Sequence, residues 1–437
     1  SAWRRAVGRP PPEVYQAASP SGYRTRATLG VGPGGSGRLE GSAVVGLFGK
    51  RRWEVVPLRG CAVNHPALDR AVASIQSAID DLKGIVHPFD HAAPKPWTLT
   101  DGALRHVELT VERSTGRVQV VLVWNGRRGC HDSSLQRLID RLWPPSRAGG
   151  PTSEWHSMFV HWREPDASLR RAIRSKSPGA WEQVRPVDEN SRADLSAVME
   201  TLDGLQFEFG PASFQQANLG VYERILRDMK NALCRIAPTS GDTARPLRLL
   251  ELCGGVGVIG LSLAHAAMSR DGSCGVELLS TDLNPGNAEP FAANARLVFP
   301  GDDPRQFKAD FFAMDSVDAV RRLLAGADEG KMNGKTPWGP ADVLIMDPPR
   351  RGLAKDERYL GGVGPGSGER EVAAMRQNKS LRGLIYMSCG YQSFMVDADR
   401  LTGADPRFAS DEWGPPFRLA ALACYDMFPF TAHIETL

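Results

Sequence analysis

The second half of the chain alternates apolar runs of strand length with stretches of helical periodicity. Glycine, proline or polar residues follow each run, and helical stretches fill the intervals. Strands that alternate with helices indicate right-handed βαβ units and a parallel sheet, whose ligands bind at the carboxyl ends of the strands. The predicted strands are Leu247–Leu252, Leu278–Asp282, Val343–Asp347 and Leu384–Ser388.

The first half follows a different pattern, typical of an α+β fold. From about Arg127 to Asn190 it is rich in Arg, Pro and Ser around an apolar run at 158–160, which predicts an insertion of loops and one strand. Ser114-Thr115-Gly116 predicts the turn of a hairpin. The other predicted elements are a strand at 53–56, a helix at 66–82 and the hairpin strands at 107–111 and 118–123.

Length and composition fit a folded protein of two or three domains. The chain has 437 residues, 42% hydrophobic and 24% charged, which excludes a disordered or fibrous chain. We expect an α/β protein with a flexible segment at 1–22, an α+β domain at 23–200 and a Rossmann-like domain at 201–437. Lys and Arg number 53 against 50 Asp and Glu, a balance that permits a nucleic-acid partner without demanding one.

The seven cysteines indicate a reducing compartment. They are scattered, and no Cys-x-x-Cys pair occurs, so neither a disulfide framework nor a metal site is expected. The longest uncharged stretch, Leu252–Ser269, contains four glycines and predicts a strand, turn and helix, so we expect no membrane anchor. The first 38 residues hold six arginines and one acid, which fits the tail of a transit peptide or a trimmed start.

A glycine-rich turn is the first candidate for chemistry. Glu251–Gly260 places glycines between a predicted strand and a helix, where backbone can approach a ligand closely. Asp282 ends the next strand and could bind ribose hydroxyls of a nucleotide cofactor such as NAD(P) or a flavin. An ordinary tight turn beside a surface acid is the alternative.

Three further segments reach the same predicted edge of the sheet. Asp347-Pro348-Pro349-Arg350 follows the third strand, and the prolines fix a rigid loop there. Cys389 ends the fourth strand, and Glu435 lies on a last predicted strand. Taken singly, these residues also fit a proline turn, a core cysteine and a surface acid.

Together these segments resemble the RNA uracil-5 methyltransferases, which make 5-methyluridine in transfer and ribosomal RNA with S-adenosylmethionine. The resemblance covers the chain from about Phe207 to its end, and its Cys-Gly-aromatic segment is similar to plant and algal members. It implies a Rossmann-like methyltransferase domain behind an RNA-contacting α+β domain. The segments are Ser213–Asn218, the turn after Glu251, Asp282 with Asn294-Ala295, Asp347–Arg350, Tyr386–Cys389 and Asp426–Glu435.

The resemblance implies a task for each matched residue. The Cys389 thiolate would add to uracil C6, and Glu435 would remove the C5 proton after methyl transfer. Because an ordinary thiol is mostly protonated at neutral pH, we expect the pocket to lower the pKa of Cys389. The implied cofactor-binding residues are Gln216, Cys253, Gly255, Gly257, Asp282, Asp310 and Asp347, with Asp282 at the ribose and Asp310 near the adenine.

Several positions depart from the family pattern. Glu251 stands where the family usually has Asp, and Asp282 where it usually has Glu. Gly390-Tyr391 replaces the Asn-Pro of many members, which predicts a less rigid loop. Glu435 lies two residues from the chain end, where fraying would misplace it. Cys61 resembles one ligand of an iron–sulfur cluster, but its partners are missing upstream, so no cluster is expected.

RNA contact is expected from the first 200 residues and the rim of the sheet. Arginines would bind phosphates and tryptophans would stack on bases, although surface arginines and core tryptophans are the alternative. The target uridine would have to leave its stack to reach Cys389. The candidates are Arg24, Arg26, Arg51, Arg52, Arg105, Arg127, Arg128, Trp53, Trp124 and Trp155.

Two other functions stay open. An RNA cytosine-5 methyltransferase shares the thiolate addition, but usually carries a cysteine in the loop that here reads Asp347–Arg350. An RNA-binding or chaperone-like protein could retain the fold without turnover. We expect an intracellular monomer without a membrane partner, in the chloroplast or otherwise the cytoplasm.

Overall fold

A computed structural model of the chain divides it into two compact units. Unit 1 comprises residues 1–18, 201–207 and 220–437, and unit 2 comprises 19–200 and 208–219. The structure describes residues 12–33, 43–49, 54–58, 60–89, 102–129, 132–144, 154–163, 180–185, 196–237, 245–270, 275–301, 306–323, 340–350, 352–353 and 369–437.

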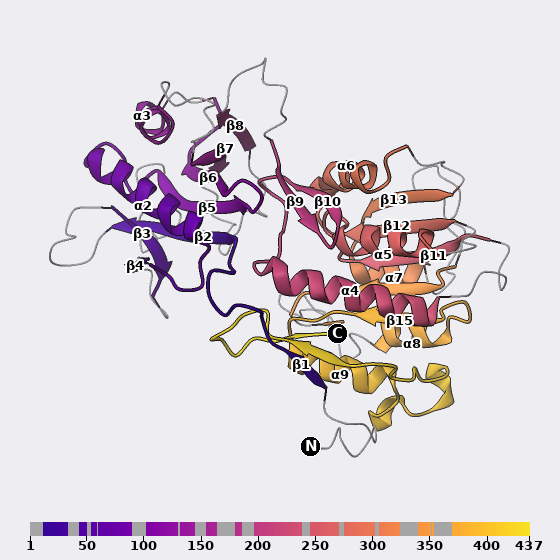
Figure 1. Cartoon of the computed structure of the whole chain (residues 1–437). Helices are drawn as coiled ribbons and strands as arrows, with labels where there is room; N and C mark the ends of the chain where they lie inside the picture. Colours follow the sequence, from indigo (N-terminus) through magenta and orange to yellow (C-terminus); the bar gives the residue numbers. More distant parts are fainter. Residues whose placement is uncertain are drawn as a thin grey trace. The chain divides into compact units, whose positions relative to one another are not determined.

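Unit 1 contains a parallel sheet of five strands in the order β13-β12-β11-β14-β15 (Figure 1). All four strands predicted from the apolar runs are present, so the expected βαβ architecture is confirmed. From β11 the chain adds β12 and β13 on one side, and it then returns to add β14 and β15 on the other side of β11. The carboxyl ends of β11 and β14 therefore form the topological switch point, where ligands bind in such sheets. The strands are β11 (Leu247–Leu252), β12 (Val276–Asp282), β13 (Phe307–Ala313), β14 (Val343–Met346) and β15 (Gly383–Tyr386).

Helices separate these strands, as the periodicity predicts. The helix after the glycine turn is apolar nearly all round, and most of its side chains are buried, as expected for a helix packed within an α/β layer. The helices are α4 (Leu219–Ile236), α5 (Val258–Met268), α6 (Ala288–Val298), α7 (Ser316–Leu323), α8 (Glu369–Gln377) and α9 (Tyr391–Leu401), with 3-10 turns at Pro285–Asn287, Pro406–Phe408 and Asp411–Trp413.

A second, three-stranded sheet joins the beginning and end of the described chain. It contains β1 (Glu13–Tyr15), β16 (Ala423–Tyr425) and β17 (Glu435–Thr436), and in Figure 1 the indigo β1 lies beside the yellow C-terminal part. The prediction of a flexible segment over 1–22 is therefore wrong for β1, which pairs in parallel with β16. Stacking of Tyr15 on Tyr425, with ring centroids 5.2 Å apart, adds to the pairing. Residues 1–11 lie outside the described residues.

Unit 2 is built on a seven-stranded mixed sheet in the order β4-β3-β2-β5-β6-β7-β8, with α2 and α3 against one face. The hairpin predicted around Ser114-Thr115-Gly116 is the pair β5–β6. The elements are β2 (Arg26–Pro33), β3 (Ala43–Phe48), β4 (Val55–Pro57), α2 (Pro66–Asp81), β5 (Leu104–Glu112), β6 (Arg117–Asn125), α3 (Ser133–Leu142), β7 (Trp155–Arg163) and β8 (Ala180–Arg185).

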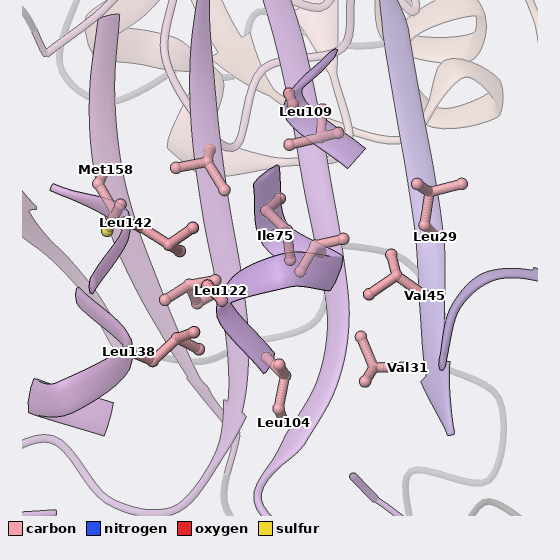
Figure 2. Close-up of a cluster of buried hydrophobic side chains, with 14 of the residues drawn as sticks. Leu29, Val31, Val45, Ile75, Leu104, Leu109, Leu122, Leu138, Leu142 and Met158 are labelled. Carbon is pink, nitrogen blue, oxygen red and sulfur yellow. The ribbon is translucent and has the colours of Figure 1, made fainter. Parts of the chain in front are cut away.

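Alternate residues of the central strands and the apolar stripes of both helices form the core of this unit (Figure 2). Each helix begins at a residue suited to capping. The His65 side chain accepts a hydrogen bond from the Ala67 amide before α2, and Asp132 Oδ1 accepts from the amides of Ser134 and Leu135 before α3.

The predicted insertion over 127–190 is in fact part of the sheet. β7 lies between β6 and β8, all nine of its residues are buried, and α3 forms the crossover between the parallel strands β6 and β7. The strand expected at 158–160 is confirmed as part of β7. The sequence analysis did not predict α3 and β8, because the polar composition around that run indicated loops. The chain then passes through the two-stranded sheet of β9 (Val198–Leu202) and β10 (Leu205–Phe209).

Two tryptophans expected to stack on RNA bases belong to this core instead. Trp124 is 1% exposed and donates its indole N–H to Asp132 Oδ2 at 2.9 Å. Trp155 is 6% exposed and donates to the Leu142 carbonyl at 2.8 Å. Buried rings with satisfied N–H groups cannot reach a base, so the base-stacking prediction is wrong for both, and Trp53 lies outside the described residues.

We expect Trp124→Phe to destabilise the protein without changing RNA affinity. The variant loses the bond to Asp132 and leaves a small cavity, a cost of roughly 1–3 kcal/mol. Urea unfolding followed by circular dichroism measures the loss, and RNA titration of the folded variant measures affinity. Weaker RNA binding at unchanged stability would restore a stacking role.

Candidate active site

Glu251, at the end of β11, is an internal support of the glycine turn. It is 1% exposed, its Oε1 accepts from the Gly260 amide at 2.7 Å, and its Oε2 accepts from the Ser280 hydroxyl at 2.6 Å. A Cβ at Gly254 or Gly260 would come within 2.4 or 2.5 Å of the carboxylate. These glycines therefore make room for Glu251, and burial raises the pKa of its carboxyl to about 7.

The turn itself has a left-handed backbone at three positions. Cys253, Gly255 and Gly257 have φ values of 59°, 57° and 87°, and Gly257 precedes α5. Nothing lies within 4 Å of the position that a Cβ on Gly255 would take, and its amide donates to Asp282 Oδ2 at 3.1 Å. Open backbone beside a carboxylate fits a nucleoside cofactor.

Asp282, the last residue of β12, lies beside this turn as predicted. Its Oδ1 also accepts from the Asn284 amide, at 2.8 Å, so both carboxylate oxygens are held in place by backbone donors. Each oxygen can accept a second hydrogen bond. The geometry therefore fits the predicted binding of two neighbouring ribose hydroxyls.

Two acids lie on and just after β13: Asp310, which the sequence analysis named, and Asp315, which it did not. Asp310 pairs in register with Leu279, three residues before β13 ends, and its carboxylate lies 3.4 Å from Lys308. Asp315 follows the strand, and its charge acts on the Cys253 thiol, whose pKa burial and neighbouring acids raise to about 12. Its position just after an apolar strand is the signal that could have identified it.

Two backbone hydrogen bonds bring Cys389 and Glu435 together. The Ser388 amide donates to the Thr436 carbonyl at 2.8 Å, and the Thr436 amide donates to the Ser388 carbonyl at 2.9 Å. In this antiparallel pair the next residue after Ser388 lies opposite the residue before Thr436. Glu435 is 2% exposed and Thr436 is fully buried, so both are held in the fold and Glu435 is not misplaced by fraying.

The pKa of Cys389 is raised, contrary to our expectation. Burial is the main cause, and the nearby acids Glu435 and Asp347 add to it. Arg350 acts in the opposite direction through its charge and a hydrogen bond to the thiol. The pocket therefore opposes an extra negative charge at sulfur, and Arg350 provides compensation.

The two acids beside the thiol also hold their protons tightly. Burial and the neighbouring Asp347 raise the pKa of Glu435 to about 8, although Arg350 lowers it. Burial raises the pKa of Asp347 to about 7. Among the residues that the structure describes, none forms a hydrogen bond with the buried Glu435 Oε2, which leaves this oxygen able to accept one from a ligand.

Tyr222 of α4 is a second residue that the sequence reasoning missed. It is buried, and burial together with the charges of Asp347, Glu251 and Glu435 raises its pKa. Its hydroxyl therefore stays protonated among these acids. No sequence motif includes Tyr222, and the sequence analysis did not predict the helix on which it lies.

The loop that carries Arg350 is fastened to α9. Ser393 Oγ donates to the Arg350 carbonyl at 2.6 Å and to the Gly390 carbonyl at 2.8 Å. A Cβ on Gly390 would come within 2.1 Å of the Arg350 carbonyl, so this close approach requires glycine. The Gly390-Tyr391 departure from Asn-Pro thus permits a contact that holds the loop.

Asp397 fixes the far end of the same loop. Its Oδ2 accepts from the Leu353 amide at 2.9 Å and from the Tyr386 hydroxyl at 2.7 Å. Gly352 has a φ of 65°, and a Cβ there would lie 2.1 Å from Asp397 Oδ2. One buried carboxylate therefore joins the loop, β15 and α9.

Gln216 and most of the predicted RNA-binding residues belong to unit 2. Gln216 is half-buried, and its cofactor role stays a prediction. Arg105 is 7% exposed and lies 4.3 Å from the centre of the Phe89 ring, which contradicts its predicted phosphate contact. Arg26 is held by Glu108 and the Ser213 carbonyl. Arg24 is half-buried, Arg127 and Arg128 are exposed, and Arg51 and Arg52 lie outside the described residues.

Among the residues that the structure describes, no group of three or more His, Cys, Asp and Glu side chains could hold a metal ion. Across the same residues, no helix has both the length and the apolar character to cross a membrane.

Comparison with known proteins places the chain near RNA methyltransferases. It is 27% identical over 420 residues to an uncharacterized RNA methyltransferase of Protochlamydia amoebophila, covering 95% of this chain and 85% of that protein. It is 23% identical over 434 residues to another from Thermosynechococcus vestitus, covering 97% of this chain and 72% of the relative. No family model matches the chain.

A solved structure has the same fold. The tRNA (uracil-54, C5)-methyltransferase of Pyrococcus abyssi, solved with S-adenosyl-L-homocysteine, aligns with a TM-score of 0.59 and 17% identity, over 100% of this chain and 80% of that one. The predicted Rossmann-like fold is confirmed. The names of the relatives agree with the prediction of an RNA methyltransferase. S-adenosylmethionine as its cofactor stays a prediction from the sequence.

The raised carboxyl pKa values predict a loss of stability as pH rises. The folded-state pKa of Glu435 is above the ordinary value of 4.5. Its contribution to the free energy of unfolding is therefore fully present below pH 4.5 and is lost as pH rises through about 8. Glu435→Gln stays neutral throughout. From pH 6 to pH 9, we therefore expect the free energy of unfolding of Glu435→Gln to increase by on the order of 2 kcal/mol relative to that of the wild type.

Urea unfolding at the two pH values tests this. Glu289→Gln, on the exposed start of α6, serves as the matched control and should follow the wild type. Parallel pH profiles for Glu435→Gln and the wild type would show that Glu435 is already ionised at pH 6.

Proposed function

We propose that this protein transfers a methyl group from S-adenosylmethionine to C5 of a uridine in RNA, either transfer or ribosomal. The observation that carries the proposal is the Ser388–Thr436 pair, which sets a thiol opposite a buried carboxyl at the carboxyl edge of a methyltransferase-type sheet. Neither general RNA binding nor methylation of a small molecule needs that pairing.

The residues at the edge fit the cofactor. When bound, S-adenosylmethionine supplies a methyl group on a positively charged sulfur. Asp282 would accept from the ribose hydroxyls, with the Gly255 amide holding its carboxylate in position. Asp310 would lie near the adenine, as the resemblance implies, and Gln216 and Asp347 would serve the methionine end.

Cys389 would begin the reaction on the base. Its thiolate adds to C6, a C–S bond forms, and the electron pair of the C5–C6 double bond moves toward C5, which makes C5 nucleophilic enough to take the methyl group. Arg350 favours the thiolate by charge and by a hydrogen bond. The thiol proton leaves to solvent or to a neighbouring carboxylate before the attack.

Glu435 would complete the reaction. After methyl transfer C5 carries both the methyl group and its original proton. The carboxylate removes that proton, the C5–C6 double bond re-forms and the C–S bond breaks, which returns Cys389 as a thiolate. A carboxyl with a pKa raised to about 8 is a stronger base than an exposed one, as this step requires.

The plant and algal subtype and a chloroplast location stay predictions from the sequence. The relatives named above are bacterial. Imaging of the tagged full-length protein in its own cells tests the location, and a signal confined to the nucleus would exclude a plastid.

Incubation with S-adenosylmethionine and 5-fluorouridine-substituted RNA should trap the protein covalently. Fluorine at C5 cannot leave as a proton, so the Cys389–C6 bond persists and a shifted band appears on a denaturing gel. Transfer and ribosomal RNA transcripts distinguish the substrate class, and 5-fluorocytidine transcripts test the cytosine alternative. Cys389→Ser should lose the band and retain cofactor binding, whereas turnover by this variant would refute the nucleophile.

Glu435→Gln should accumulate the adduct with ordinary uridine RNA. The amide cannot take the C5 proton, so we expect turnover to fall by roughly 10²–10⁴-fold while a band persists on the gel. Cofactor binding by the variant is the control for folding. A folded, cofactor-binding variant that turns over at the wild-type rate would contradict the role of Glu435 as the base.

A further inference from the structure

Two exposed aromatic rings lie on the chain segments that carry Cys389 and Glu435. Tyr391 is the first residue of α9, two positions after the thiol, and is 48% exposed. Phe430 lies in the loop between β16 and β17 and is 78% exposed. Neither ring contributes to the described core, so the packing of the fold does not account for them.

The strand pairing places the Phe430 loop at the edge where Cys389 lies. β16 and β17 are antiparallel, with Tyr425 opposite Glu435, so the loop between them leaves and re-enters the sheet beside Glu435. The Ser388–Thr436 bridge puts Cys389 at that same end. Both rings therefore belong to chain segments that begin at the edge that carries the thiol and the carboxyl.

The backbone at Phe430 is strained. The Phe428 carbonyl accepts from the Thr431 amide at 3.1 Å, which makes Phe428–Thr431 a β-turn with Pro429 second and Phe430 third. Phe430 has a φ of 67°, a conformation that favours glycine or asparagine at this turn position and costs an aromatic residue energy. A phenylalanine that is both strained and exposed indicates a contact outside the chain.

Charge around the two rings favours a nucleic acid. Segments 389–392 and 428–433 contain no acidic residue. His433 is exposed on the second segment, and Arg350, whose carbonyl is bound to Ser393 of α9, is exposed beside the first. Flat aromatic faces with neighbouring cationic groups are the features that bind unpaired bases and their phosphates.

We propose that Phe430 and Tyr391 form a stacking platform for the unpaired RNA bases beside the target uridine. The proposal rests on the proposed function and names the residues that hold the substrate. A target base drawn out of its stack leaves its neighbours without stacking partners. Two fixed rings next to the thiol would replace those partners and hold the RNA open.

A binding measurement in a non-reacting protein tests the platform. The full chain with Cys389→Ala is titrated with a stem–loop RNA that carries 2-aminopurine beside a loop uridine, whose fluorescence is quenched by stacking. Phe430→Gly relieves the strained φ, so its melting temperature should not fall. We expect its Kd for the RNA to rise between about fivefold and a hundredfold, with loss of the quenching.

Matched variants separate stacking from general apolar contact. Phe430→Trp keeps a ring and should retain affinity, and Tyr391→Ala should weaken binding as Phe430→Gly does. Val396→Ala removes a side chain that is equally exposed, at 48%, from the same helix and should change nothing.

Each other outcome overturns the platform. Unchanged affinity and quenching in Phe430→Gly would do so, as would an equal loss in Val396→Ala. The proposed function is tested separately by the 5-fluorouridine trap in the protein with Cys389 intact. A missing adduct together with a sensitive Kd would reject methyl transfer and leave the RNA-binding surface standing.

Discussion

Burial of acidic groups at one edge of one parallel sheet is the constraint on which the rest of unit 1 depends. Glu251, Asp347 and Glu435 all have raised pKa values, chiefly because they are removed from water. Ionised carboxyls in such a place repel one another, so the fold must supply donors or keep the protons on. At Glu251 the fold supplies donors, the Gly260 amide and the Ser280 hydroxyl. At Glu435 it keeps the carboxyl protonated, and no described residue forms a hydrogen bond with Oε2 of that carboxyl. Burial thus makes Glu251 a support of the glycine turn, and it leaves Glu435 as a carboxyl that could act as a base.

The fold holds the Arg350 guanidinium near the buried acids by fixing the backbone of the short loop that carries it. Arg350 is a single positive group beside the thiol, and its guanidinium can act only if its backbone stays in place. Ser393 binds the carbonyl of Arg350, and Asp397 binds the amide of Leu353, so α9 holds the loop on both sides of Gly352. The helix that follows Cys389 thereby also positions the arginine that favours its thiolate.

Periodicity predicted the elements of unit 1 well, because parallel strands between helices are continuous apolar runs with clear ends. It missed β13 in this unit, and it missed α3 and β8 on either side of the strand that it did predict at β7. It also missed β1, which has only three residues and whose stability comes from a partner more than four hundred positions later in the chain. Motif spacing named Cys389 and Glu435 as candidates, and the fold brings them together, but the spacing could not predict that the pKa of the thiol is raised. That sign depends on burial and on which acids face the sulfur, both of which are properties of the folded chain.

The raised thiol pKa is compatible with the proposed chemistry when the thiol and Glu435 are treated as one coupled pair. Two negative charges side by side are costly, so the pair tends to carry one at a time. While Glu435 keeps its proton, the sulfur can ionise without that repulsion, and a thiolate of higher pKa is intrinsically more nucleophilic. Addition to C6 then consumes the sulfur charge. Once that charge is gone, Glu435 can ionise at lower cost, just when C5 has a proton to give up. In the proposed reaction, this repulsion would make Glu435 available as a base after Cys389 has added to C6, in the order that the chemistry of C5 requires.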